Sequence, residues 1–361
     1  MSIFQSYILY YFIIVATSLI VLLSSRFKNN LSLSRVIFLI ALILPVFISG
    51  LRYGIGTDYF NYEAIYYELT NSGSVVDNFL NTRYEPGWIL LNHIVKFIFN
   101  DVKYVFILSS ILIWVFNFKA IYDNRNKISI SIAVLILLCT SYNQSFNMVR
   151  QALAAAILML SIKPIVNKKP LKFIITVLIS TMFHYTAIIF LPIYWIVNSK
   201  IKALGLWKKI LTFIGVGLAV MLAPTLLKFV TNYEAFEYFS HYDLNFQNFG
   251  IGNIIIKLPV ILIILLNIRK LNSTNPISKL VIVYFLSLLL EYIGYFAAHV
   301  SRIAIYYEMM QIFILAAIVK TQQNKYERLF YSFLIFIYFL GWFTYQIIYL
   351  NNHETVPYIW L

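Results

Sequence analysis

Long apolar segments, separated by short polar connections, make up most of the chain. An α-helix rises about 1.5 Å per residue, so roughly 20 apolar residues cross the hydrocarbon core of a bilayer. Segments of about this length run over residues 5–23, 34–51, 104–121, 128–146, 149–166, 207–230, 251–268, 279–298, 302–319 and 328–350. The pattern predicts an all-α polytopic integral membrane protein, with about ten spanning helices plus short re-entrant or interfacial helices. It shows no internal repeat, so we expect residues 1–361 to form a single transmembrane domain.

The charge of the connections predicts how the helices are oriented. Basic connections lie near residues 26–35, 119–127, 163–172, 200–209, 269–279 and 320–328. The long connections 52–85 and 231–250 are richer in Asp, Glu, Tyr and Asn. Because Lys and Arg collect in cytoplasmic loops, the basic connections should lie inside, and both long loops and both termini outside.

Two segments do not fit this alternation as plain spans. Residues 86–99 and 104–121 must together cross only once, so the shorter, more polar 86–99 should lie in the interface or re-enter. Residues 171–197 have basic loops on both sides and should fold back on themselves, with the break at Phe183-His184-Tyr185. A single long tilted span is the alternative, and it would put one basic loop outside.

Composition supports a membrane protein and excludes other classes. The chain is 61% hydrophobic and 12% charged, whereas soluble domains average roughly 45–50% apolar and about 25% charged residues. The formal net charge of +14 follows from loop orientation, so we expect no nucleic-acid partner. The single Cys139 permits no intrachain disulfide and no cysteine metal site. Residues 1–23 lack the basic region and cleavage site of a signal peptide, so we expect them to be retained as the first span.

The most unusual polar stretch is residues 51–62, at the end of the second span. Gly54 and Gly56 allow a tight turn or a close approach to a ligand, and Arg52 and Asp58 place opposite charges beside it. Three tyrosines with apolar bodies and polar tips suit a membrane interface or a sugar face: Tyr53, Tyr59 and Tyr62. The alternative is an ordinary interfacial turn with a surface ion pair.

The predicted topology brings further polar residues to the same outer face. They are Arg52, Asp58, Glu85, Arg150, Gln151, His184, His299 and Arg302. Ionisable groups at a membrane are candidates for function, and arginine on the outer face runs against the usual charge gradient. A guanidinium grips phosphate oxygens bidentately and stays charged. The set therefore predicts a site for a diphosphate whose lipid tail lies in the bilayer, unless each arginine pairs with a local carboxylate and snorkels to headgroups.

The remaining polar residues give weaker evidence of function. His184 and His299 are either bases or hydrogen-bonded structural residues. Glu291 and Glu308 lie inside apolar spans and must be paired or protonated, which would also suit a proton path. No His/Asp/Glu spacing resembles a metal site and no cofactor motif is present, so we expect neither metal nor cofactor.

Several short motifs in the sequence resemble those of a known family. Arg52-Tyr-x-x-Gly-x-Asp-Tyr-x-x-Tyr62, Glu85-Pro-Gly-Trp88, Arg150-Gln151, Phe183-His184, Arg302-x-x-x-Tyr306 and Pro357-Tyr358 are similar to the EpsG family of exopolysaccharide and O-antigen clusters, related to the Wzy polymerases. The resemblance implies a polymerase of repeat units carried on undecaprenyl diphosphate, at the outer face of the bacterial cytoplasmic membrane. It also implies likeness to membrane glycosyltransferases of the GT-C type, and possible partners in a flippase and a chain-length regulator.

The preferred hypothesis is therefore a glycosyltransferase. We expect Arg52, Arg150 and Arg302 to bind the donor diphosphate. Asp58 is the first candidate for the base that deprotonates the acceptor hydroxyl, with Glu85 and His184 behind it. A flippase or other transporter is the alternative; it needs cations across the whole bilayer. A membrane acyltransferase would need a histidine nearer the cytoplasm.

Overall fold

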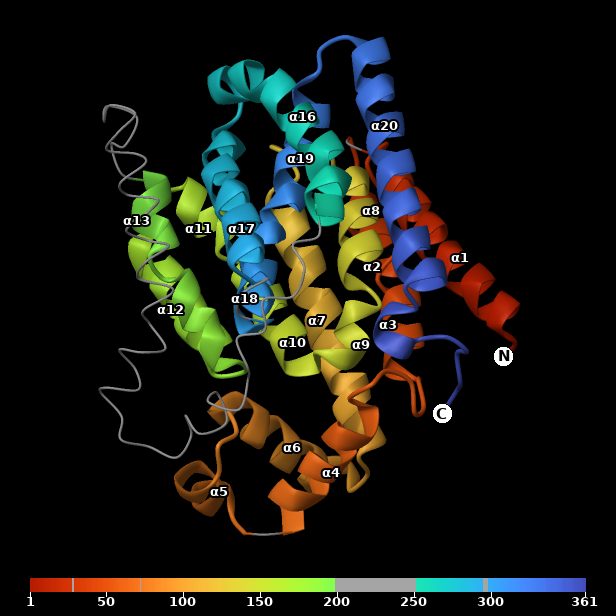
Figure 1. Cartoon of the computed structure of the whole chain (residues 1–361), viewed down its shortest axis with the longest axis vertical. Coiled ribbons are helices and arrows are strands. Elements are labelled where there is room, and N and C mark those ends of the chain that lie inside the picture. The colour runs from red at the N-terminus through yellow and green to blue at the C-terminus, as the bar shows by residue number, and fades with distance from the viewer. Residues whose placement is uncertain (28, 72, 199–250, 295–297) are drawn as a thin grey trace.

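The computed structural model describes residues 1–27, 29–71, 73–198, 251–294 and 298–361, and this part of the chain is helical throughout (Figure 1). The predicted segment 207–230 and the predicted outer loop 231–250 lie outside the described residues. The first half contains α1 (Ile3–Ser24), α2 (Leu31–Ile40), α3 (Ile43–Gly50), α4 (Tyr59–Asn71), α5 (Val75–Asn81), α6 (Pro86–Phe99), α7 (Lys103–Asp123), α8 (Ile130–Ser141), α9 (Gln144–Asn147), α10 (Val149–Met159) and α11 (Ile162–Val166). The second half contains α12 (Pro170–Thr181), η1 (Tyr185–Phe190), α13 (Ile193–Asn198), α16 (Ile251–Thr274), η4 (Pro276–Leu280), α17 (Val281–Gly294), α18 (Ala298–Glu308), α19 (Met310–Thr321), α20 (Lys325–Thr344), η5 (Tyr345–Tyr349) and η6 (Asn352–Glu354).

Six described helical stretches are long and apolar enough to cross a membrane. They are Ile3–Ser24, Leu31–Gly50, Lys103–Asp123, Val149–Val166, Val300–Thr321 and Lys325–Tyr349. The chain is thus a multi-pass membrane protein. Several other predicted segments form shorter helices, since a turn or break divides them. One example is α8, which ends at Ser141 where residues 128–146 were expected to continue as one helix.

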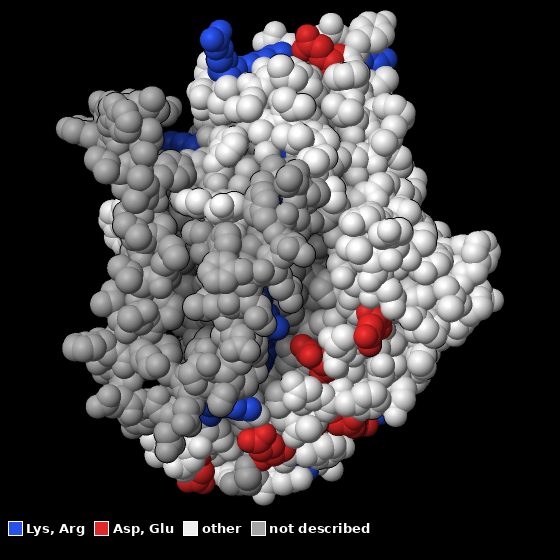
Figure 2. Space-filling model, in the orientation of Figure 1, with Lys and Arg blue, Asp and Glu red and all other residues white. Residues whose placement is uncertain are grey.

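The basic connections meet at one end of the bundle, the upper end in Figure 1. The Lys127 side chain donates to Asn167 Oδ1 at 3.3 Å, and the Lys127 carbonyl accepts from Asn275 Nδ2 at 2.6 Å. The Lys279 side chain donates to Asn198 Oδ1 at 3.3 Å. Figure 2 shows Lys and Arg side chains at this end beside one acidic patch, and further acidic side chains toward the other end, where some Lys or Arg side chains also lie. The connections 119–127, 163–172 and 269–279 therefore share one end, as expected from their charge, whereas 200–209 lies outside the described residues.

The predicted fold-back of residues 171–197 is confirmed. Helix α12 leaves the upper end, and η1 and α13 return to it after the turn at residues 182–184. Asn198, at the end of α13, donates through Nδ2 to the carbonyl of Ile165 at 3.1 Å, next to the start of α12. The alternative of a single tilted span is therefore wrong. The turn delivers His184 to the end of the bundle opposite the basic connections.

Helices α4, α5 and α6 form a cap over that opposite end (Figure 1). Helix α6 does not cross the bundle, as expected for an interfacial segment; it packs against α4 and α5. Its outer face is apolar and exposed, with Phe97 92% and Ile98 60% accessible. Such a face on a short helix suits the boundary between lipid and water.

A C-terminal strap, residues 351–361, packs against the end of α3 and the start of the polar stretch 51–62. The Leu361 N–H donates to the Leu51 carbonyl at 2.9 Å, and the Tyr53 N–H donates to the Ile359 carbonyl at 3.0 Å. The buried Tyr358 donates its hydroxyl to the Ile48 carbonyl at 2.7 Å. The strap holds the polar stretch 51–62 in place, so the Pro357-Tyr358 pair has a structural role.

Candidate functional site

The candidate site is assembled where the cap meets the turn after α12. The Gly87 N–H donates to the Met182 carbonyl at 2.7 Å. A Cβ on Gly87 would lie 2.8 Å from that carbonyl oxygen, so only glycine allows this approach. Pro86 occupies the first turn of α6, where its missing N–H costs nothing. The Pro-Gly pair thus sets the preceding residue, Glu85, against the turn.

Glu85 is the centre of a buried ion cluster. Its side chain is 4% exposed. Arg150 Nη1 donates to Oε2 at 2.6 Å, and His184 Nδ1 contacts Oε1 at 2.9 Å. Burial tends to raise the pKa of Glu85, but the bonds from His184 and the charge of Arg150 outweigh it and hold the pKa below its usual range. The carboxylate is therefore ionised with both oxygens occupied, which suits an anchor for Arg150 and His184 better than a base.

Arg150 keeps part of its guanidinium free of this pairing. Its side chain is 24% exposed and lies over the ring of Tyr84, 5.7 Å from the centroid. Tyr62, buried in α4, faces it from the cap. One edge of the planar group is thus fixed by Glu85, its Nε is buried, and Tyr62 interacts with it as well, so only the part of the side chain that remains exposed can meet a ligand.

Asp58 and Arg302 complete the cluster. Asp58 is half-buried, and within the described residues its carboxylate forms no hydrogen bond or ion pair. Burial raises its pKa, against the opposing charges of Arg302 and Arg150. The Arg302 side chain is exposed and likewise has no hydrogen-bonded or ionic partner among the described residues. An unpaired carboxylate thus faces two arginines, one anchored and one free.

Arg52 lies outside this cluster, and the alternative of a surface ion pair between Arg52 and Asp58 is wrong. Arg52 is buried at 2% exposure; it donates to the Ser49 carbonyl and, at 3.2 Å, to the Phe146 carbonyl. Its guanidinium lies 5.0 Å from the ring centroid of Phe106. Burial lowers its pKa to about 10. Gly56 explains the separation. Its φ of +94° turns the chain between Arg52 and Asp58, and a Cβ there would collide with Asn147.

The three tyrosines of the polar stretch differ in how far they are buried. Tyr59 is buried and stacks on Phe106 with 4.2 Å between ring centroids. Tyr62 is buried too, so neither presents a face to a sugar. Tyr53 is 48% exposed and is the one of the three that can. The tyrosine spacing could not reveal this, because α4 packs one side of the stretch against the bundle.

The structure describes the side chain of Gln151 but not that of His299. Gln151 is buried, and its Nε2 donates to the Arg302 carbonyl at 2.6 Å, which links α10 to α18. It therefore positions Arg302. His299 lies in the first turn of α18, but its side chain is outside the described part of the structure.

Sequence reasoning missed Lys257, which lies within α16. Its Nζ pairs with both Glu291 and Glu308, the latter at 2.8 Å. A lysine inside the apolar segment 251–268 is itself a signal of a buried partner. The two glutamates expected to be paired or protonated thus share one cation.

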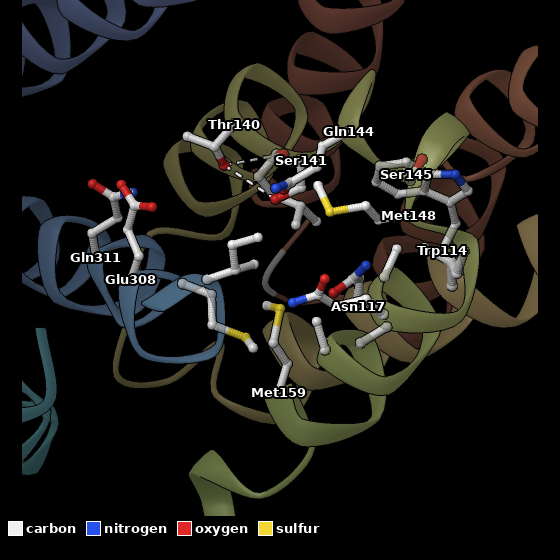
Figure 3. Close-up of a pocket in the computed structure, with 18 residues that line it drawn as sticks. Trp114, Asn117, Thr140, Ser141, Gln144, Ser145, Met148, Met159, Glu308 and Gln311 are labelled. Carbon is white, nitrogen blue, oxygen red and sulfur yellow. Dashed lines mark hydrogen bonds between the residues drawn. The ribbon is translucent and has the colours of Figure 1, made fainter. Parts of the chain in front are cut away.

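A small cavity with a mostly apolar lining and a few polar side chains borders Glu308 of this lysine cluster. It measures about 60 Å³ and is bounded by α7, α8, α9, α10, α18 and α19. Figure 3 shows Glu308 and Gln311 side by side on one wall and Thr140 and Ser141 on another. Gln151 also lines it, so the cavity reaches the residue that positions Arg302.

Comparison with known proteins identifies a family. The model of the EpsG family matches residues 35–360. No curated protein and no solved structure matches the chain significantly.

Proposed function

Because the chain belongs to the EpsG family, linked to exopolysaccharide biosynthesis, we propose that it is a polysaccharide polymerase of the Wzy kind. It joins oligosaccharide repeat units carried on undecaprenyl diphosphate, with about ten spans and a glycosyltransferase architecture of the GT-C type. The cap faces the exterior of the bacterial cytoplasmic membrane, opposite the basic connections. The observation that carries the proposal is the convergence of Asp58, Arg150 and Arg302 at this end.

The arginines bind the donor diphosphate. Arg302 is exposed and unpaired among the described residues, and Arg150 has one edge held by Glu85. Two guanidiniums at different depths match a diphosphate at the membrane surface whose polyprenyl tail enters the bilayer. In the transfer step the bond between the anomeric carbon and the diphosphate oxygen breaks, and negative charge grows on the leaving oxygen. The arginines stabilise that charge.

Asp58 is the base. The acceptor hydroxyl of a second repeat unit attacks the anomeric carbon and gives its proton to the Asp58 carboxylate. A carboxylate with a raised pKa and no hydrogen bond in the described structure is a better proton acceptor than Glu85, which is fully occupied. Arg302 and Arg150 keep Asp58 ionised until the hydroxyl arrives. Glu85 and His184 hold Arg150 in its orientation, and Tyr53 is available to stack against a sugar ring.

The first experiment is glycan analysis of a strain that lacks this protein. A polymerase mutant still displays a single repeat unit on its surface, whereas a flippase mutant displays none. Purified protein should also elongate chains from lipid-linked repeat units without any other enzyme. Loss of all surface glycan, or no elongation by well-folded protein, would overturn the proposal.

A lipid-linked oligosaccharide transporter is the second candidate, and one observation favours it. Lys257 places a cation inside the bundle, where a path for diphosphate would need one. Two glutamates pair with that cation, however, and Arg302, unpaired among the described residues, is at the cap end. The glycan analysis separates the two functions directly.

A further inference from the structure

A second charged cluster lies inside the bundle, apart from the candidate site. Lys257 of α16 pairs with Glu291 of α17 and with Glu308 of α18, at 2.8 Å to Glu308 Oε1. Glu308 lies inside the candidate span Val300–Thr321. The Lys257 side chain is 12% exposed, so little of its charge reaches the surface. The polymerase reaction proposed above uses none of these groups.

The charges of this cluster do not balance. One ammonium and two carboxylates leave a net negative charge when all three are ionised. Among the described residues, the other titratable groups that face it are the phenols of Tyr284 on α17 and Tyr338 on α20, both neutral at physiological pH. Gln311 of α19 adds an amide, 3.4 Å from Glu308 Oε1. A net charge within a membrane span is costly, so the cluster needs one more positive charge.

We propose that Glu291 and Glu308 together bind one proton, held between them and Lys257 as a membrane-embedded proton site. A carboxylic acid with its partner ionised makes the cluster neutral: one ammonium, one carboxylate and one protonated carboxyl. The two carboxylates share a single lysine nitrogen, which brings them close enough to share the proton. The Tyr284 hydroxyl is buried without a partner in the described structure and interacts electrostatically with both carboxylates.

The cavity beside Glu308 offers a route for this proton along its polar side chains. Glu308 and Gln311 form one of its walls (Figure 3). A water molecule needs about 10–15 Å³ of such space, so a cavity of about 60 Å³ has room for water beside its polar side chains. Gln151 lines the same cavity and bonds the carbonyl of Arg302. The same cavity thus borders both the proton site and the residue that positions Arg302.

The test uses a hydrophobic carbodiimide on the purified full-length protein in lipid nanodiscs. The reagent adds to a protonated carboxyl and leaves a stable acylurea that mass spectrometry locates. An ordinary glutamate is only about 0.1% protonated at pH 7.5, so a carboxyl that keeps its proton should react at least about tenfold faster than the exposed Glu327. We expect labelling on Glu291 or Glu308, falling as pH rises.

Single substitutions make the sharing of the proton testable. In Glu308→Gln, Glu291 and Lys257 form a balanced pair, so labelling of Glu291 at pH 7.5 should disappear, and Glu291→Gln should protect Glu308 in the same way. In Lys257→Met the cation is lost, and labelling should persist to a pH at least about one unit higher. Size-exclusion profiles check that each variant remains folded, and replacement of sodium by choline should change nothing.

Three results would overturn the proposal. One is wild-type labelling no faster than that of Glu327 at pH 7.5. Another is unchanged labelling of Glu291 in a folded Glu308→Gln protein, which would mean that each carboxyl titrates alone. The third is protection by sodium at constant ionic strength, which would make the ligand a metal cation. None of these readouts depends on polymerase activity.

Discussion

The sequence predicts the same diphosphate-binding role for Arg52 and Arg150, but the structure places them in opposite environments. Arg150 pairs with a carboxylate, Glu85, at 2.6 Å and remains 24% exposed. Arg52 has no ionic partner in the described residues; two carbonyls and two aromatic rings enclose it. A carboxylate partner holds a guanidinium in place and can leave some of its N–H donors for a ligand. A fully enclosed guanidinium has its donors directed to the protein itself, so it stabilises the fold. The comparison teaches that an arginine in a motif is not evidence of a binding role until its surroundings are known.

The largest expected effect is on the carboxylate that faces the arginines. Asp58→Asn keeps the shape of the side chain but removes the proton acceptor. A general base contributes about 10²–10⁴-fold, so elongation from purified lipid-linked repeat units should fall at least about a hundredfold, with substrate binding retained. Asp77→Asn is the control, because Asp77 only caps α5 on the surface. Near-normal elongation by folded Asp58→Asn would transfer the role of base to Glu85 or His184.

The pH profile refines the same assignment. Burial raises the pKa of Asp58, and a base works in its deprotonated form. Wild-type elongation should therefore decline as pH falls through the Asp58 pKa, beginning above the ordinary aspartate value of about 3.9. A profile in which this acidic limb is identical in wild type and in residually active Asp58→Asn would contradict the role.

Arg150→Lys should have the next largest effect. Lysine keeps the charge but lacks the planar fork that bonds Glu85 and a phosphate together. Loss of one charge-assisted hydrogen bond, about 1.5–3 kcal/mol, corresponds to roughly 10–100-fold in elongation rate. Arg125→Lys, at the opposite end of the bundle, should elongate normally. Full activity of the double variant Arg150→Lys/Arg302→Lys would contradict the proposal that these two arginines bind the diphosphate.

Arg52→Lys should show the contrasting pattern. A lysine cannot reach both the Ser49 and Phe146 carbonyls, and a buried acceptor left unsatisfied costs about 1–3 kcal/mol. Thermal unfolding in detergent should occur at a lower temperature. The elongation rate per folded molecule should stay within about twofold of wild type, less than the effect of one lost hydrogen bond. If instead Arg52→Lys unfolds normally and loses activity, the distinction between the two arginines fails.

The smallest expected effect concerns the strap. Tyr358→Phe removes one hydroxyl, which donates to the Ile48 carbonyl at 2.7 Å. The free energy of unfolding should fall by about 1 kcal/mol, the typical value of such a bond. Tyr349→Phe, whose ring is 78% exposed, should leave it unchanged. If the two variants had the same free energy of unfolding, the strap would not stabilise the region around Arg52.

The sequence by itself determined the properties that depend on composition along the chain. Apolar length predicted a helical multi-pass protein, and the charge of the loops predicted which connections share an end. The basic loops on both sides of residues 171–197 predicted that this segment folds back, because positive charge resists the outer face. These inferences succeed because transfer of a segment into lipid depends on its own residues.

Only the tertiary structure decided which of the polar residues meet. Arg52 and Asp58 are six positions apart, but the turn at Gly56 separates them, and Asp58 faces Arg302 instead. Glu85 reaches His184 because Gly87 lets two backbones touch. Lys257 finds its glutamates on two other helices. Hydrogen bonds and ion pairs act over about 3 Å, and that distance depends on the packing of segments far apart in the chain.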